Sequence, residues 1–372
     1  MPGLVLPLPG GSQEYQVPAQ RDWPDRAEPA RSRIVFAAAH VVAQSPTRLD
    51  WDATLRFRHR LWSLGLGVAD ALDTAQRGMG LDWPAARELI LRSGAEARAC
   101  GGRLCCGAGT DQLPAGRAGL DDIVAAYEEQ LDAVEQAGAQ PVLMCSRALA
   151  ASARGPDDYA KVYGTLLGQV TGPVILHWLG DMFDPALRGY WGSTDLDVAA
   201  EHVLAVAGAH PDRVDGIKVS LLDAGREVAL RRRLPPGVRL YTGDDFSFAP
   251  LIAGDAQGFS DALLGVFDPL AAPAAVALGR LDAGDVAGFR AVLDPLVPLA
   301  RHIFAAPTQY YKTGMVFLAW LSGYQDRFVM VGGQQAGRDR PHLAELFRLA
   351  ADAGLFPDAG LATGRMRRFL GD

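Results

Sequence analysis

The chain has 372 residues, of which 49% are hydrophobic and 21% charged, and this balance favours a folded protein with a large core over disorder. The formal net charge of −7, without a basic block or an aromatic–basic stripe, argues against nucleic acid as a partner. No segment has the roughly 18 uninterrupted apolar residues that a membrane helix needs, so we expect no membrane partner.

The N-terminal residues and the cysteines bear on the cellular compartment. Residues 1–20 lack a basic start followed by an apolar run, so no secretory signal is expected. The cysteines show neither zinc-site nor disulfide spacing, and we interpret them as small core side chains of a cytoplasmic protein. They are Cys100, Cys105, Cys106 and Cys145.

Eight short runs bounded by Gly, Pro or Asp are typical of β-strands. Nearly all are apolar along their length, as expected for parallel strands that are buried on both faces. The runs are 34–39, 66–72, 103–107, 141–145, 173–178, 214–220, 238–242 and 260–266.

Helical patterns lie between several of these runs. One begins at Asp82, a good N-cap, and has Pro84 in its first turn. The alternation of strands and helices predicts βαβ units and therefore a (β/α)8 TIM barrel, whose functional groups lie at the C-terminal ends of the strands. The predicted helices are 82–99, 120–136, 157–170 and 195–209.

Further helical patterns follow the eighth run and predict a C-terminal helical extension. No stretch between 266 and 285 has the composition of a free linker, so we expect this extension to pack on the barrel. The predicted organisation is an irregular N-terminal arm over 1–30, a barrel over 31–284 and the extension over 285–372. The extension's helical patterns are 285–304, 311–322, 341–353 and 358–370.

Lys218 is the leading candidate for chemistry because it interrupts the otherwise apolar run 214–220. A lysine on a buried strand loses solvation, which lowers the pKa of its amine and makes the amine nucleophilic. The alternatives are a lysine that reaches solvent from the strand end, or one that pairs with a carboxylate.

At this point the sequence resembles the dihydrodipicolinate synthase/N-acetylneuraminate lyase family of class I aldolases. Family members carry the Schiff-base lysine in a G-I-K segment of strand six, which matches 216–218, and a motif close to S-G-D-D on the next strand, which matches T-G-D-D at 242–245. A proline followed by a lysine that opens a helix matches Pro307 and Lys312. The resemblance runs from about Arg33 to the C-terminus.

The resemblance implies a class I aldolase-type lyase in which Lys218 forms an imine with a small carbonyl substrate. It implies no cofactor and no metal, and a homodimer or homotetramer. Retro-aldol cleavage, condensation and dehydration share the imine intermediate, so all three reactions stay open.

Two departures from the family pattern concern the substrate. His177 stands where the family has a proton-relaying tyrosine, and a histidine can do this work because its pKa lies near neutrality. The strand-two loop that binds a substrate carboxylate in the family corresponds to 73–77, where Thr74 is kept and the other landmark residues are absent. Arg77 could bind an anion instead, so a 2-oxo acid and an uncharged keto sugar both remain open.

Other polar or aromatic residues at predicted strand ends complete the candidate substrate site. His40 closes the first run, and Asp73 and Asp244 each follow a run. Of the adjacent pair Asp244 and Asp245, we expect the first to face the site and the second to cap the next helix. Trp178 follows His177 and is also expected to contact substrate.

The loop 180–193 and the segment after the fourth run add two further features. The loop is long and rich in aromatic residues, which suits either a polyhydroxylated ligand or packing against a neighbouring subunit. Ser146 and Arg147 stand near the position of a tyrosine-containing strand-four motif of the family.

Two other functions stay open at this level. A metal-dependent barrel isomerase or aldolase could use His40, Asp73, His177 and Asp244 as ligands. A non-catalytic sugar-binding barrel is the third possibility, although the retained Lys218 argues against it.

Overall fold

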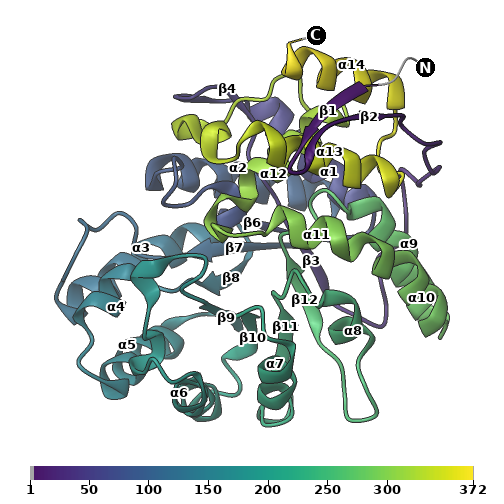
Figure 1. The fold of residues 1–372 in the computed structure, drawn as a ribbon. Helices are drawn as coiled ribbons and strands as arrows, with labels where there is room; N and C mark the ends of the chain where they lie inside the picture. The colour runs from purple at the N-terminus through teal and green to yellow at the C-terminus, as the bar shows by residue number, and fades with distance from the viewer. Residues whose placement is uncertain (1–3, 372) are drawn as a thin grey trace.

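The computed structural model describes residues 4–371, and its centre is a closed barrel of eight parallel strands (Figure 1). The last strand pairs with the first, so the sheet has no free edge. Every predicted run overlaps one strand, which confirms the predicted TIM barrel. The strands are β3 (Val35–Ala38), β6 (Gly67–Asp70), β7 (Leu104–Ala108), β8 (Gln140–Leu143), β9 (Val174–Leu179), β10 (Val214–Ser220), β11 (Arg239–Thr242) and β12 (Asp261–Leu264).

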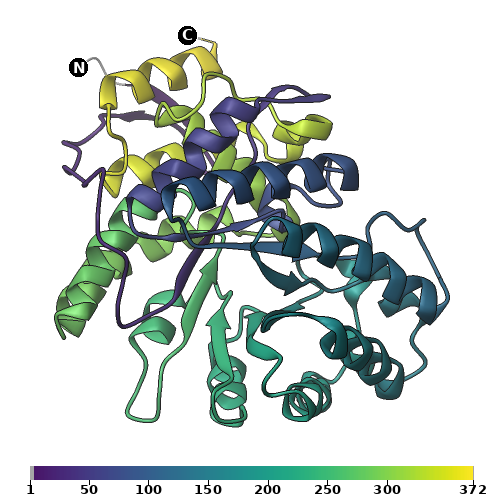
Figure 2. The same cartoon turned by 180° about the vertical axis from the view of Figure 1, so that it is seen from behind.

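Helices connect the strands and cover the outside of the barrel (Figures 1 and 2). The four predicted helices are found with bounds shifted by no more than one residue: α2 (Trp83–Cys100), α3 (Leu120–Gln136), α5 (Pro156–Gln169) and α6 (Leu196–Ala209). Five further helices were not predicted from the sequence: α1 (Trp51–Ser63), α4 (Arg147–Ser152), α7 (Ala224–Arg231), α8 (Phe248–Ala253) and α9 (Ala271–Asp282).

The inside of the barrel is filled by side chains that alternate with outward-facing ones along each strand. His177 on β9 is paired in register with Lys218 on β10, so both side chains face the same way, into the barrel. The apolar part of this interior is a cluster of its own, made of Phe36, Ala38, Ala69, Leu72, Cys105, Val142, Met144, Ile175, Tyr241 and Leu263.

The predicted C-terminal helices are present and lie over one side of the barrel (Figure 1). The first predicted helix is divided where Pro295 and Pro298 interrupt it, as proline does inside a helix. Every residue of α12 is buried, so this helix belongs to the core. The helices are α10 (Val286–Leu293), α11 (Val297–Ile303), α12 (Tyr311–Leu321), α13 (Arg340–Asp352) and α14 (Ala359–Leu370). None of the helices within residues 4–371 is long and apolar enough to span a bilayer.

The N-terminal arm is not irregular throughout, which corrects the expectation for 1–30. Its strands β1 (Leu4–Leu8) and β2 (Gly11–Tyr15) form an antiparallel hairpin. Leu4 and Leu6 are buried, and Tyr15 donates a hydrogen bond of 2.7 Å to Asp352 of α13. The physical reason is local, since the apolar side chains of the first strand alternate before a Pro-Gly turn. Residues 1–3 lie outside the described residues.

A buried ion pair ties α1 and α2 to the barrel. Arg58 of α1 and Asp70 of β6 form two hydrogen bonds of 2.8 and 3.1 Å, and both side chains are fully buried. The second partner of Asp70 is Ser93 of α2, whose hydroxyl donates at 2.6 Å. The guanidinium also donates to the carbonyl of His40 at the end of β3. The bond network thus joins two strands and two helices.

We expect Arg58→Met to lower the free energy of unfolding by about 3–5 kcal/mol, because it leaves the carboxylate of Asp70 buried without its cation. Urea denaturation of the purified protein measures this change. Arg56→Met, at an exposed position of the same helix, is the control and should change the free energy by less than about 0.5 kcal/mol. Equal losses for the two variants would contradict the assigned role of the pair.

Candidate active site

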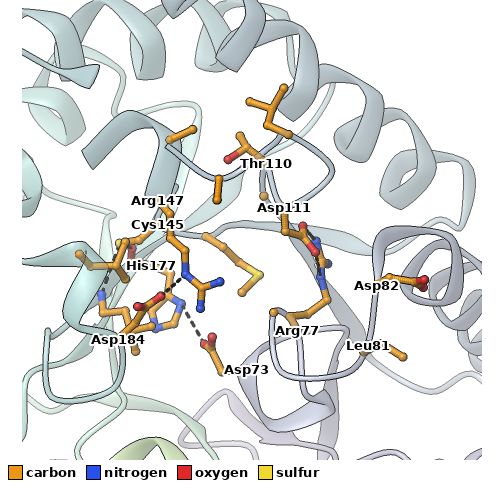
Figure 3. Close-up of a pocket in the computed structure, with 18 of the residues that line it drawn as sticks. Asp73, Arg77, Leu81, Asp82, Thr110, Asp111, Cys145, Arg147, His177 and Asp184 are labelled. Carbon is orange, nitrogen blue, oxygen red and sulfur yellow. Dashed lines mark hydrogen bonds and ion pairs between the residues drawn. The ribbon is translucent and has the colours of Figure 1, made fainter. Parts of the chain in front are cut away.

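A cavity of about 420 Å³ opens at the C-terminal ends of the barrel strands (Figure 3). Its walls come mainly from the segments that follow β6, β7, β8 and β9. Figure 3 shows Arg147 and Asp184 on one side of the cavity, Arg77 and Asp111 on the other, and Asp73 between them. The volume lies in the range of 300–1,000 Å³ that small-molecule sites occupy.

Lys218 lines a second, much smaller cavity of about 20 Å³. This space is enough for roughly one water molecule or one small polar group. Asp73 and Leu179 line both cavities, so they form the boundary between the large chamber and the lysine. A substrate in the large cavity would therefore have to extend past Asp73 to reach Lys218.

The environment of Lys218 favours its neutral amine. The side chain is 7% exposed, and burial lowers the pKa of Lys218, with Asp73 and Asp245 acting in the opposite direction. Burial also raises the pKa of Asp245 to about 8. Both groups are thus pushed toward their uncharged forms, in which the amine is a nucleophile and the carboxyl group is a proton donor.

His177 lies beside Lys218 in the barrel interior and is fully buried. Its Nε2 is 3.3 Å from the hydroxyl of Ser220, and its Nδ1 is 4.0 Å from a carboxylate oxygen of Asp73 and has no hydrogen-bond partner within residues 4–371. Burial, followed by the charge of Lys218, lowers the pKa of His177 well below its ordinary value. The ring is therefore neutral.

The structure reverses the expectation for the two adjacent aspartates. Asp245 lines the lysine cavity, and its carboxylate accepts a hydrogen bond of 2.8 Å from the backbone N–H of Val266. Asp244 accepts hydrogen bonds from the backbone N–H groups of Phe246 and Ser247, at 2.8 and 2.9 Å, and thus caps the turn that leads into α8. The two positions are one residue apart, and only the path of the turn after β11 decides which of them faces the barrel.

Thr74, which the sequence predicts to bind substrate, lines the lysine cavity. Its hydroxyl is 3.0 Å from the hydroxyl of Tyr311, which also lines that cavity. Burial raises the pKa of Tyr311 well above its ordinary value, so its phenol stays protonated. From the sequence, Tyr310 and Tyr311 open a predicted helix and one of them could reach the barrel mouth, although core packing is favoured for both; no local signal places the hydroxyl of Tyr311 there.

Arg77 lines the large cavity, but its donors are already used. Its guanidinium donates to both carboxylate oxygens of Asp111, to Gln130 at 2.7 Å and to the backbone carbonyl of Ala71 at 3.1 Å. The side chain is 3% exposed. The expectation that Arg77 binds an anion is therefore not supported by its contacts, which hold the loops after β6 and β7 together.

Two residues that the sequence placed in the site lie elsewhere. The ring nitrogens of His40 contact Asp268 at 2.7 Å and Gln325 at 3.1 Å, and His40 lines neither cavity. Trp178 points to the opposite side of β9 from His177, because successive side chains of a strand alternate. It lines a groove with Leu196 outside the barrel.

Two aromatic residues of the loop after β9, Tyr190 and Trp191, pack within the protein, whereas Phe183 lines the lysine cavity. Tyr190 and Trp191 are buried against Tyr159 and Tyr163 of α5. They belong to the core of this chain and are not available to a ligand or to another subunit. The loop's contribution to the large cavity comes instead from Asp184 and Leu187.

The four residues considered for a metal site do not converge. His177 and Asp73 approach each other, whereas His40 pairs with Asp268 and Asp244 caps a turn. Within the part of the chain that the structure describes, no group of three or more His, Cys, Asp or Glu side chains is arranged to hold a metal ion.

Comparison with solved structures shows which known proteins share this fold. The fold matches dihydrodipicolinate synthase from Aquifex aeolicus with a TM-score of 0.66 and 13% identity, covering 87% of this chain and 99% of that chain. The enzyme from Thermotoga maritima matches with a TM-score of 0.66 and 14% identity, covering 87% and 100%. YagE of E. coli K12, a prophage protein of the same family solved in complex with pyruvate, matches with a TM-score of 0.69 and 14% identity, covering 87% and 99%.

The protein therefore has the dihydrodipicolinate synthase fold. The chain belongs to the family described as "Protein of unknown function (DUF993)", which matches residues 4–371. No curated protein matches the sequence.

We expect Gly243→Ala to disturb the lysine cavity. A Cβ at this position would meet the carbonyl oxygen of Val219 at 2.8 Å and Cε of Lys218 at 3.1 Å, so we expect a loss of about 1–3 kcal/mol in unfolding free energy. The control is Gly279→Ala in α9, where nothing lies within 4 Å and helix propensity favours alanine by about 1 kcal/mol. Chemical denaturation should give opposite signs; a stabilising effect at Gly243 would contradict the tight packing.

Proposed function

We propose that the protein is a Schiff-base lyase in which Lys218 forms an imine with a small carbonyl substrate. The observation that carries this proposal is a buried lysine on a barrel strand, beside two carboxyl groups and a neutral histidine, at the boundary of a ligand-sized chamber. The likeness in fold to dihydrodipicolinate synthase supports it, because the corresponding strand carries the imine-forming lysine in that family.

The use of lysine in this chain gives independent support. The sequence has 33 arginines and only three lysines, Lys161, Lys218 and Lys312. Lys161 is exposed, whereas the other two are buried near the barrel mouth. Arginine stays charged in proteins, whereas a buried lysine can lose its proton, so the two buried lysines are the groups of this chain that can provide a neutral amine near the cavity.

In the proposed reaction, the neutral amine of Lys218 adds to the carbonyl carbon of the substrate. The carbinolamine then loses its hydroxyl group as water, with a proton supplied by Asp245, and leaves a protonated imine. In retro-aldol cleavage, a base takes the proton of the β-hydroxyl group and the imine accepts the electron pair of the breaking C–C bond to become an enamine, whose carbon is then protonated. In dehydration, a base removes the α-proton and the imine accepts the C–H electron pair to become an enamine, which expels the β-hydroxyl group as water after that group is protonated. In either case, addition of water to the resulting imine releases the product and restores Lys218.

His177 is proposed to carry protons to and from the substrate. Its ring faces Ser220 and Asp73, and Asp73 stands where the two cavities meet. A neutral imidazole with one free nitrogen can take a proton from a substrate hydroxyl or return one to the enamine carbon. Thr74 and Tyr311 are proposed to bind the oxygen of the carbonyl group from the other side of the small cavity.

The main prediction is a covalent adduct. Incubation with borohydride and a panel of 2-oxo acids, including pyruvate, and keto sugars should reduce the imine to a stable amine on Lys218. Intact mass gives the mass of the trapped compound, and peptide mapping gives its position. With three lysines in the chain, the assignment is unambiguous.

Two variants make this experiment specific. Lys218→Ala should abolish the adduct, because it removes the amine. Lys312→Met should keep it, although burial lowers the pKa of Lys312 to about 8 and makes this lysine a competing nucleophile. An adduct that persists in Lys218→Ala, or no adduct with any compound that binds, would overturn the proposal.

The rate of trapping should also depend on pH. Only the unprotonated amine attacks, so the rate should rise with pH and level off above the pKa of Lys218. Because burial lowers this pKa, we expect the plateau to begin below pH 10.4, which is about the ordinary lysine value. A rate that still rises at that pH would show that Lys218 is not perturbed in solution.

A further inference from the structure

Arg147 presents an unused guanidinium edge to the large cavity. It opens α4 after β8, and its side chain is 51% exposed. The Nε atom forms an ion pair of 2.5 Å with Asp184, which is mostly buried in the loop after β9. Within residues 4–371 the two terminal nitrogens of Arg147 have no hydrogen-bond partner, and Figure 3 shows them pointing into the cavity.

The position of this guanidinium is set from two sides. Asp184 holds Nε, and Asp184 is itself fixed because it accepts a backbone hydrogen bond from Ala186 at 3.1 Å. The terminal nitrogens lie close to Gly78, where a Cβ would come within 2.8 Å of one and 3.1 Å of the other. The backbone of Gly78 has a φ of +68°, which glycine adopts without strain, so the chain provides room for the guanidinium there.

Two cations, Arg147 and Lys312, lie on this side of the cavity together with the carboxylates of Asp184 and Asp73. The carboxylate of Asp111 is already paired with Arg77 across the cavity. Burial lowers the pKa of Lys312 to about 8, and Arg147 contributes to this lowering, so the two cations repel each other while they share Asp184. A bound carboxylate or phosphate would relieve this repulsion and satisfy the two free donors.

We propose that Arg147 binds an anionic group of the substrate at a distance from the reacting carbonyl carbon. This inference rests on the proposed function, which supplies the reaction of the substrate's carbonyl group with Lys218. The substrate class is then a carbonyl compound with a carboxylate or a phosphate at its far end. The terminal nitrogens of an arginine form two parallel hydrogen bonds with either group.

The arrangement of the two cavities agrees with such an extended substrate. The carbonyl group enters the 20 Å³ space next to Lys218, and the remainder lies in the 420 Å³ chamber that Arg147 borders. Apolar side chains, among them Leu81, Leu113 and Leu187, cover much of the chamber between the charged groups. An uncharged keto sugar would leave the two donors of Arg147 without a partner.

The first test measures anion binding without the imine. Glutarate and inorganic phosphate are titrated by calorimetry into the wild type and into Lys218→Ala, Arg147→Met and Arg147→Lys. We expect the Lys218→Ala variant to bind both anions, and the Arg147→Met variant to bind them about 10- to 100-fold more weakly. The affinity of the Arg147→Lys variant should lie between those of the Lys218→Ala and Arg147→Met variants, because lysine keeps the positive charge but cannot form two parallel hydrogen bonds to one anion. Binding that is absent from the wild type or unchanged in Arg147→Met overturns the inference.

The second test uses borohydride trapping with matched carbonyl compounds. One pair is 4-oxopentanoate and 5-hydroxy-2-pentanone, and the other is dihydroxyacetone phosphate and dihydroxyacetone. The pair whose charged member is trapped faster shows whether the site prefers a carboxylate or a phosphate. In the wild type the charged member should be trapped about 10- to 100-fold faster at low concentration, and in Arg147→Met the two members should react alike. The control is Arg154→Met, since Arg154 is 82% exposed and does not line the cavity.

The outcomes separate the two proposals. If no compound is trapped while anion binding still depends on Arg147, the Schiff-base function falls and the anion site stands. If compounds are trapped on Lys218 at the same rate with and without a charge, in the wild type and in Arg147→Met, the anion site falls and the Schiff-base function stands.

Discussion

Closure of the eight-stranded barrel is the constraint on which the rest of the structure depends. A closed sheet has no edge, and every second side chain must point into a space just wide enough to be filled by side chains. This geometry removes Lys218 and His177 from water on neighbouring strands. The cost of burying an amine is reduced by Asp73 and Asp245, so the chemistry of the site follows from where the strands place these groups.

The large cavity shows how two similar ion pairs can have different roles. The donors of Arg77 are used by Asp111, Gln130 and the carbonyl of Ala71, and these contacts connect two loops, which makes the Arg77–Asp111 pair part of the framework. Arg147 and Asp184 satisfy only one nitrogen of the guanidinium and leave the rest exposed to the cavity. The number of unused donors, and not the residue type, separates a structural arginine from one that is ready for a ligand.

The fold is shared with dihydrodipicolinate synthase at 13–14% identity, which is far too low to carry over a substrate. His177 faces the barrel interior beside Lys218, and a buried contact between Thr74 and Tyr311 lines the lysine cavity. The substrate class therefore has to be inferred from the donors and charges of this chain. The arginine that follows β8 is the strongest such indication.

The sequence by itself determined the eight strands and the main helices, because hydrophobic periodicity is a local feature. It also singled out Lys218 as the candidate for chemistry, because an isolated charge in an apolar run is a local feature too. It did not determine the direction of individual side chains. Asp245 took the place expected for Asp244, Trp178 faced outward and His40 paired with a distant carboxylate. These outcomes depend on the path of each turn, on strand parity and on partners more than 200 residues away in the chain, which only the tertiary structure brings together.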